Sequence, residues 1–214
     1  MAYHKEPLPM SALIQESYIA VKALLLFSCL LGLVYPLTIT LIAQFALPES
    51  SSGSLIKRDG KVVGSKLIGQ AFASEHYFHS RPSAHHYNGM ASGASNLGPS
   101  SKKLRRVTLE RILLSRIINQ IPPFMSLPAD MVLTSASGLD PHISIENALL
   151  QLPRIAQIRN LDETTLKTLI VQNLEQPLMG MWGQARINVL LLNLALDKVT
   201  QQQPTTIVQP SIPL

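Results

Sequence analysis

The chain has 214 residues, a formal charge of +5 and a single cysteine, Cys29. One cysteine excludes a disulfide within the chain and a cysteine-based metal site, so packing must stabilise the fold. The excess of positive charge is compatible with anionic lipid headgroups or acidic protein surfaces as partners.

The most prominent segment is residues 23–47, which carry no charge. As a helix this segment would be roughly 37 Å long, more than the ~30 Å hydrocarbon core of a bilayer. A cleaved signal peptide is the alternative, but its apolar core normally runs only ~7–15 residues and ends at a small-residue cleavage site. We therefore expect one retained transmembrane helix. Pro36 lies in its middle, where it should kink the helix and indicates a packing partner.

Flanking charges indicate the orientation of this helix. Lys5 and Lys22 precede it, whereas Glu49 and several serines follow it, which favours a cytoplasmic N-terminus. The expected organisation is a cytoplasmic segment 1–22, a transmembrane helix 23–47, an extracytoplasmic domain 48–200 and a disordered tail 201–214. Such a compartment argues against a nucleic-acid partner.

The first elements of the domain are predicted from turn signals and periodicity. Residues 54–70 alternate apolar and polar side chains around Asp59-Gly60, which predicts a β-hairpin. Glycines, serines and asparagines in residues 88–101 predict a long exposed loop. Residues 102–120 repeat a large apolar side chain every fourth position and carry six basic residues and the lone acidic Glu110 on the other faces, which predicts a helix that ends before Pro122-Pro123. Its basic faces are either solvated or a docking surface for acidic groups.

The second half of the domain contains further helix signals. Ser144 and Asp162 are suited to cap two helices, and Pro153 should shorten or bend the first of them. Residues 187–196 are largely apolar and could form a buried strand or a buried helix; their length favours a helix. Together these segments predict an α+β (or α/β) domain.

Candidate catalytic groups are few. Ser137, Asp140 and His142 lie within six residues, which is the residue set of a hydrolytic triad, but such close neighbours more readily form a turn.

Four histidines, His76, His79, His85 and His86, could bind zinc or copper, although a scattered surface cluster is favoured because Glu75 alone accompanies them. The sequence contains no phosphate-binding loop and demands no cofactor of its own.

Several motifs in order along residues 30–197 resemble the KdpC family, the C subunits of the Kdp potassium-transporting P-type ATPases. They are LGLVYPL at 31–37, GSLI at 53–56, VGSKLIGQ at 63–70, YFHSRPSA at 77–84, SNLGP at 95–99, SASGLDPHIS at 135–144 and RINVLLLNLALD at 186–197.

The resemblance implies a non-catalytic accessory subunit in the inner membrane of a bacterium. Its partners would be a channel-like potassium-binding subunit, a P-type pump subunit that hydrolyses ATP and a small lipid-like subunit, together with membrane lipids. The family is also described as a catalytic chaperone that raises the ATP affinity of the pump subunit. ATP is cytoplasmic, whereas the flanking charges place this domain outside, so we give the expected topology more weight than direct ATP binding.

The matched motifs also supply the candidate contact residues, whose alternative role is internal hydrogen bonding that shapes loops. Beside Pro36 they are Arg81, Asn96, Asp140, His142, Arg154, Arg186 and Asn188. Arg81 and Arg186 are the best candidates for contacts with carboxylates. Two rival functions remain open: a membrane-anchored periplasmic hydrolase that uses Ser137 or Ser100, and a solute-binding module.

Overall fold

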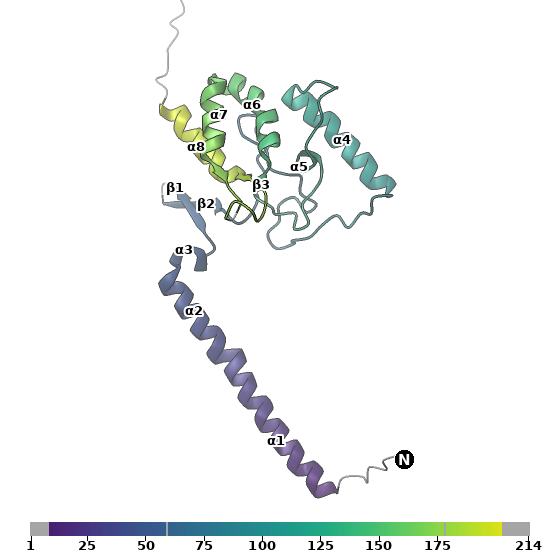
Figure 1. Cartoon of the computed structure of the whole chain (residues 1–214), viewed down its shortest axis with the longest axis vertical. Coiled ribbons are helices and arrows are strands. Elements are labelled where there is room, and N and C mark those ends of the chain that lie inside the picture. The colour runs from purple at the N-terminus through teal and green to yellow at the C-terminus, as the bar shows by residue number, and fades with distance from the viewer. Residues whose placement is uncertain (1–8, 59, 178, 203–214) are drawn as a thin grey trace, which may run out of the picture. The chain divides into compact units, whose positions relative to one another are not determined.

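The computed structural model describes residues 9–58, 60–177 and 179–202. The chain forms two compact units, Met1–Ser54 and Leu55–Leu214. The first unit contains one long helix (Figure 1), and the second contains the strands and the remaining long helices. The predicted tail 201–214 lies outside the described residues from 203 onward.

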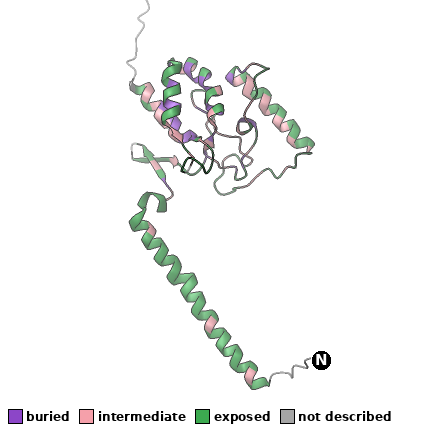
Figure 2. Cartoon of the chain, in the orientation of Figure 1, coloured by how far each residue is buried: buried purple, intermediate pink, exposed green. Residues whose placement is uncertain are grey.

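The long helix is apolar and long enough to span a membrane. It runs from Met10 to Ala46 and consists of α1 (Met10–Cys29), a π-helical stretch (Leu30–Val34) and α2 (Tyr35–Ala46), followed by the single turn α3 (Pro48–Ser51). A helix of 37 residues is roughly 55 Å long, which exceeds the bilayer core. Its apolar side chains are exposed (Figure 2), as they would be toward lipid.

Pro36 is accommodated by a change of helical register. The π-helical stretch ends directly before it, where the backbone N–H of Tyr35 donates to the carbonyl of Leu30, five residues back. Pro36 thus lies in the first turn of α2, where its missing N–H is tolerated. The helix continues through this point (Figure 1), so the expected irregularity takes the form of a wide turn.

The observed helix begins earlier than the predicted span. Residues 10–22 continue it toward the N-terminus, and the Nζ atom of Lys22 lies 4.2 Å from the centroid of the Tyr18 ring. A tyrosine and a lysine in cation–π contact are typical of the interface between lipid and water. The predicted boundary near residue 22 therefore falls within a continuous helix, and residues 1–8 lie outside the described part of the chain.

The second unit begins with the predicted hairpin. Strands β1 (Leu55–Arg58) and β2 (Lys61–Ser65) pair antiparallel, with a bulge after Ile56. Gly60 adopts a φ of +76°, as a tight turn requires, while Asp59 lies outside the described residues. The hairpin prediction is confirmed.

A second small sheet lies farther along the chain. Its strands β3 (His142–Ile143), β5 (Arg186–Asn188) and β4 (Leu174–Glu175) follow in this order and pair antiparallel. The helices of this unit are α4 (Lys102–Asn119), α5 (Ala129–Val132), α6 (Ile145–Arg159), α7 (Glu163–Gln172) and α8 (Val189–Gln202). The mixture of helices and strands after one apolar N-terminal helix confirms the predicted fold class.

Local signals predicted the starts of two helices correctly, whereas the expected shortening of one of them is not observed. The Ser144 hydroxyl accepts from the Asn147 N–H at 3.1 Å, and the Asp162 carboxylate accepts from the Thr164 N–H at 2.9 Å, so both predicted caps are confirmed. Pro153 was expected to shorten or bend α6, but the helix continues six residues beyond it to Arg159. The expectation of a shortened helix is wrong, because the surrounding residues of α6 are buried in the core and sustain the helix.

The apolar run 187–196 contains both of the alternatives that the sequence left open. Ile187 and Asn188 belong to β5, and α8 begins at Val189. The helix favoured by length is thus correct for most of the run. The side chain of Asn188 caps it, since its Oδ1 accepts from the Leu191 N–H at 3.2 Å.

The core lies between α6, α7 and α8 (Figure 2) and includes one aromatic side chain from an irregular segment. Phe78 is fully buried although it belongs to no helix or strand. The buried Asn193 of α8 accepts from the Phe78 N–H at 2.9 Å and donates to its carbonyl at 2.9 Å. One amide side chain thereby satisfies both backbone groups that a neighbouring strand would otherwise pair.

We predict that Asn193→Ala destabilises the domain by about 2–4 kcal/mol, because the Phe78 N–H and carbonyl lose their partner inside the core. Thermal unfolding of the full chain in detergent, followed by circular dichroism, measures this. Lys198→Ala, at an exposed position of the same helix, is the control and should leave the midpoint nearly unchanged. Equal midpoints for the two variants would contradict the assignment.

Candidate functional site

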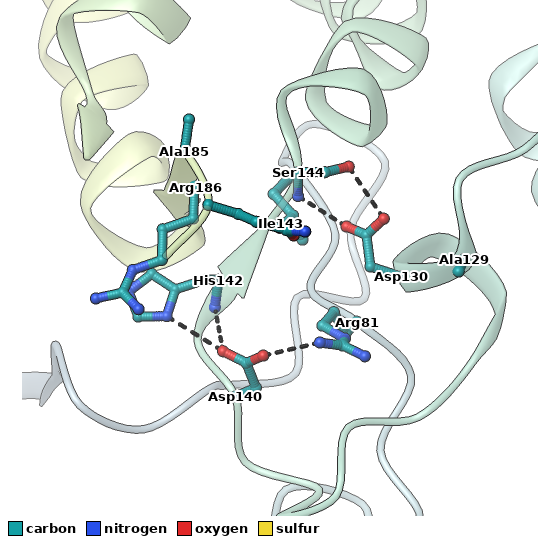
Figure 3. Close-up of a pocket in the computed structure, with 10 residues that line it drawn as sticks. Arg81, Ala129, Asp130, Asp140, His142, Ile143, Ser144, Ala185 and Arg186 are labelled. Atoms are coloured by element: carbon teal, nitrogen blue, oxygen red, sulfur yellow. Dashed lines mark hydrogen bonds and ion pairs between the residues drawn. The ribbon is translucent and has the colours of Figure 1, made fainter. Parts of the chain in front are cut away.

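A pocket of about 440 Å³ in the second unit collects four of the candidate residues predicted from sequence (Figure 3). They are Arg81, Asp140, His142 and Arg186. The structure adds three polar side chains to the lining, Asp130 of α5, Ser144 directly before α6 and Gln184.

Two neighbouring strands and a turn position these side chains. His142 lies on β3 and pairs in register with Asn188 of β5, and Arg186 lies at the start of β5. Asp140 precedes β3 in a tight turn, where its Oδ1 accepts from the His142 N–H at 3.0 Å. The turn predicted from the sequence is therefore present, and it directs the Asp140 carboxylate into the pocket (Figure 3).

Four charged groups and His142 form one continuous chain of contacts. Arg81 Nη1 lies 2.9 Å from Asp140 Oδ2, and His142 Nδ1 lies 3.2 Å from Asp140 Oδ1. On its other side, His142 Nε2 lies 3.4 Å from Glu175 Oε2, and Arg186 Nε lies 3.0 Å from the same oxygen. Both His142 ring nitrogens therefore lie within 3.4 Å of carboxylate oxygens.

The electrostatic state of Asp140 follows from these contacts. Burial by itself would raise the pKa of its carboxyl, but hydrogen bonds from the His142 ring and backbone and the charge of Arg81 more than offset it, so the pKa lies below its usual value. Asp140 is consequently ionised at neutral pH. It does not act as a proton donor there.

Asp130 is fully engaged with the start of α6. One of its oxygens accepts from the Ser144 hydroxyl at 3.0 Å, and the other accepts from the Ser144 N–H at 2.8 Å and from Asn147 Nδ2 at 2.9 Å. Each carboxylate in or beside the pocket is thus bound to a donor of this chain. These contacts hold the backbone before β3 and at the start of α6 in place.

Arg154 lies outside this pocket, in the interior. It is 2% exposed and donates to Asn119 Oδ1 at 2.9 Å, to the Tyr77 carbonyl at 3.0 Å and to Gln151 Oε1 at 3.1 Å, as well as to the Glu75 carbonyl. Burial lowers its pKa to about 10, partly offset by the charge of Glu75, so the guanidinium stays protonated at pH 7. Its contacts join α4 and α6 to the segment before Phe78.

The remaining candidates lie apart from the pocket. Asn188 is buried and donates to the Lys66 carbonyl at 2.7 Å, which connects β5 to the segment after the hairpin. Asn96 is exposed in the loop 88–101 with a left-handed φ of 51°, a conformation that asparagine tolerates. Pro36 belongs to the long helix of the other unit.

The serines of the hydrolase alternative are not joined to a histidine in the described part of the chain. The Ser137 hydroxyl accepts from the Leu139 N–H at 3.1 Å and lies 3.5 Å from the Ser135 hydroxyl, as expected for a turn residue. Ser100 is exposed in the turn before α4. Since His142 faces Asp140 and Glu175, the three residues of the proposed triad do not form the required relay.

Two of the four histidines considered as metal ligands make separate local contacts. His79 Nε2 lies 3.2 Å from the Ser74 carbonyl and His85 Nδ1 lies 3.1 Å from the Gly93 carbonyl. Burial, with a contribution from Arg154, lowers the pKa of His79 below its usual value. Within residues 9–58, 60–177 and 179–202, no three His, Cys, Asp or Glu side chains gather as a metal site would require.

Sequence reasoning did not select several polar residues that organise the domain. They are Asp130, Glu175, Gln151, Asn193 and Asp197. Asp197 accepts from Arg58 at 2.9 Å, from Arg159 at 3.0 Å and from the Tyr77 hydroxyl at 3.2 Å. A usable signal did exist for Asn193, because it interrupts an otherwise apolar helical run and polar groups inside such runs require a buried partner.

The described chain thus combines one apolar helix of membrane-span length with a mixed helix-and-strand unit that carries an internally paired polar site. A model of the family described as "K+-transporting ATPase, c chain" matches residues 17–198. The chain therefore belongs to the KdpC family.

Curated relatives agree with this assignment. The potassium-transporting ATPase KdpC subunit of Cereibacter sphaeroides is 49% identical over 178 residues, which cover 83% of this chain and 94% of the relative. The KdpC subunit of Bradyrhizobium diazoefficiens is 44% identical over 200 residues, which cover 87% and 98%. That of Mycobacterium bovis is 43% identical over 182 residues, which cover 84% and 96%.

We predict that the domain loses stability in acid in part because Asp140 becomes protonated. Its pKa is lower in the folded chain than in the unfolded chain, so its contribution is complete above about pH 5 and is lost as the pH falls through 4 toward the folded pKa. Asp140→Asn should cost about 1–2 kcal/mol at pH 7, and the difference from the wild type should shrink on acidification.

Thermal unfolding of both proteins between pH 7 and pH 3 measures this difference. Glu110→Gln, which removes a carboxylate that is 66% exposed, is the control and should stay close to the wild type throughout. A gap between wild type and Asp140→Asn that keeps its size down to pH 3 would show that the charge of Asp140 does not contribute.

Proposed function

We propose that this chain is the non-catalytic accessory subunit of an ATP-driven potassium uptake complex and that it stabilises the assembly of the other subunits. Its partners would be the channel-like potassium-binding subunit, the P-type subunit that hydrolyses ATP and the small lipid-like subunit. The proposal rests on membership of a family whose curated members are named subunits of a potassium-transporting ATPase.

The observation that carries a non-catalytic role is the pairing of the charged groups in the pocket. Asp140 and Glu175 are each bound by two basic or imidazole groups of the same domain, and Asp130 is bound by a hydroxyl, an amide and a backbone N–H. Contacts of this kind hold the pocket in one shape. A fixed shape is what a docking surface needs.

The membrane part of the proposal places the long helix beside the channel-like subunit in the bacterial inner membrane. The wide turn before Pro36 gives this helix an irregular face that a neighbouring helix can complement. Tyr18 and Lys22 would mark the cytoplasmic interface, and the domain from residue 48 to about 200 would lie outside, near the extracellular mouth of the channel-like subunit.

Direct binding of ATP is not part of this proposal. The nucleotide is cytoplasmic, whereas the proposed topology places the folded domain on the other side of the membrane. The effect on ATP affinity that the family resemblance implies would then reach the pump subunit through contacts of the helix.

The proposed orientation predicts that protease added to intact spheroplasts removes the domain. The loop 88–101 is largely exposed and is a suitable site of cleavage. Immunoblots with antibodies against the domain follow the cleavage, and a cytoplasmic protein that stays intact serves as the control. Cleavage that requires lysis of the spheroplasts would place the domain in the cytoplasm and refute the orientation.

The proposed docking role predicts that Arg186→Ala weakens the complex more than it weakens the fold. The Arg186 side chain is 57% exposed and pairs with a half-exposed Glu175, so its loss should change folding stability by less than about 1 kcal/mol. Two measurements test this. The first is whether the variant restores growth at limiting potassium to a strain that lacks this subunit, and the second is whether the variant co-purifies with the other subunits.

Lys167→Ala is the matched control, because Lys167 is also 57% exposed and pairs with Glu163 at 3.4 Å on α7, away from the pocket. We expect the control to rescue growth and to co-purify fully, and Arg186→Ala to do so several-fold less. If Arg186→Ala and Lys167→Ala gave equal growth and equal yields of complex, Arg186 would not belong to the docking surface.

A further inference from the structure

One face of α4 carries large apolar side chains that no part of the described chain covers. Leu109, Leu113, Leu114 and Ile117 are 53%, 62%, 56% and 75% exposed. Leu109, Leu113 and Ile117 recur at every fourth position and therefore form one stripe along the helix, with Leu114 at its edge. Much of the outer side of α4 is coloured as exposed in Figure 2.

The opposite face of α4 is the one that packs against the domain. Arg111 Nη1 donates to the Val132 carbonyl at 3.1 Å, and the buried Asn119 accepts from Arg154 at 2.9 Å. Ile112 packs against the small cluster around Met131. These contacts fix the rotation of α4 about its axis, so the apolar stripe cannot turn inward.

A cationic cluster precedes the stripe on the same helix. It consists of Lys102, Lys103, Arg105 and Arg106, all of which are exposed. Glu110 is the acidic residue of α4, and it lies 3.7 Å from Arg106. The solvent side of α4 thus changes from strongly basic in its first turns to apolar in its later turns.

We propose that this face of α4 binds the surface of an anionic lipid bilayer, with the stripe inserted at the boundary of headgroups and acyl chains and the cationic cluster on lipid phosphates. Leucine and isoleucine on one exposed face together with lysine and arginine is the composition of helices that lie in a membrane interface. The inference requires a membrane-anchored chain and does not depend on the proposed subunit role.

Two features favour lipid over the other possible occupants. Eight residues, 47–54, separate the long helix from β1, so the domain is held next to a bilayer and meets it as an intramolecular partner at high effective concentration. A second copy of α4 would instead bring a second cluster of four cations close to the first, and like charges oppose such contact.

The test uses the full-length chain in nanodiscs. Cys29→Ser removes the native thiol, and Leu113→Cys then carries an environment-sensitive fluorophore on the stripe. With phosphatidylglycerol in the disc we expect a blue-shifted emission and at least two-fold stronger quenching by spin-labelled lipid than in discs of phosphatidylcholine alone. High salt should reduce the quenching, because it screens the attraction of the cationic cluster.

The matched control carries the same fluorophore at Val171→Cys, a position on α7 that is 68% exposed in the native chain. This label should stay in water in both kinds of disc. Changing the four cations to glutamine should abolish the response at position 113 to phosphatidylglycerol. Hydrogen exchange of the unlabelled wild-type chain should show added protection in α4 in anionic discs alone, which guards against an effect of the label.

Three results would overturn the proposal. A label that stays in water in anionic discs shows that α4 does not reach the lipid. Equal shielding in neutral discs, anionic discs and detergent shows that protein, such as a second copy, covers the stripe. Shielding that arises only when the pump and channel subunits are added identifies a protein partner; that result would leave the proposed subunit function standing while removing lipid as the occupant.

Discussion

The domain depends on side chains of α6, β5 and α8 that hydrogen-bond the backbone of an irregular segment. Its sheets are small, with strands of two to five residues, so they pair little of the chain between residues 66 and 80. Asn188 and Asn193 instead bind the carbonyl of Lys66 and both backbone groups of Phe78, and Gln151 of α6 accepts from the His79 N–H at 2.7 Å. Because buried backbone groups must be paired, these amides perform the task that a longer sheet performs elsewhere.

The same segment carries Arg81 into the pocket, and this connects the interior to the proposed docking surface. Gln151 and Asn193 fix residues 78–79, and two residues later Arg81 meets Asp140, 59 positions away in the sequence. From there the chain of polar contacts continues through His142 to β4 and β5. A chain of this kind makes each charged group depend on its neighbours, so it favours one arrangement of the surface over many, which suits a subunit that must be recognised by several others.

The parts of the fold that the sequence predicted were those encoded by neighbouring residues. The hairpin and the caps at Ser144 and Asp162 each depend on contacts within about ten positions, and all were predicted correctly. The pocket brings Arg81, Asp140 and Arg186 together from distant positions in the sequence. The motifs identified these residues as candidates but could not show that they lie in one pocket. Pro153 does not end α6 for a related reason: its neighbours in this helix lie in the core, and their burial outweighs the hydrogen bond that the proline removes.

The orientation of α4 shows most clearly what periodicity cannot determine. The sequence identified an apolar stripe but not the side of the helix that would face the domain, and the common expectation is that the larger apolar side chains face inward. In this domain, polar contacts determine which face of α4 packs inward. Arg111 and Asn119 find their partners only with their own face toward the domain, and turning that face outward would leave the buried Arg154 without its contact to Asn119. The exposed stripe is therefore enforced by the interior, and an apolar surface maintained in this way is characteristic of a site that another surface covers.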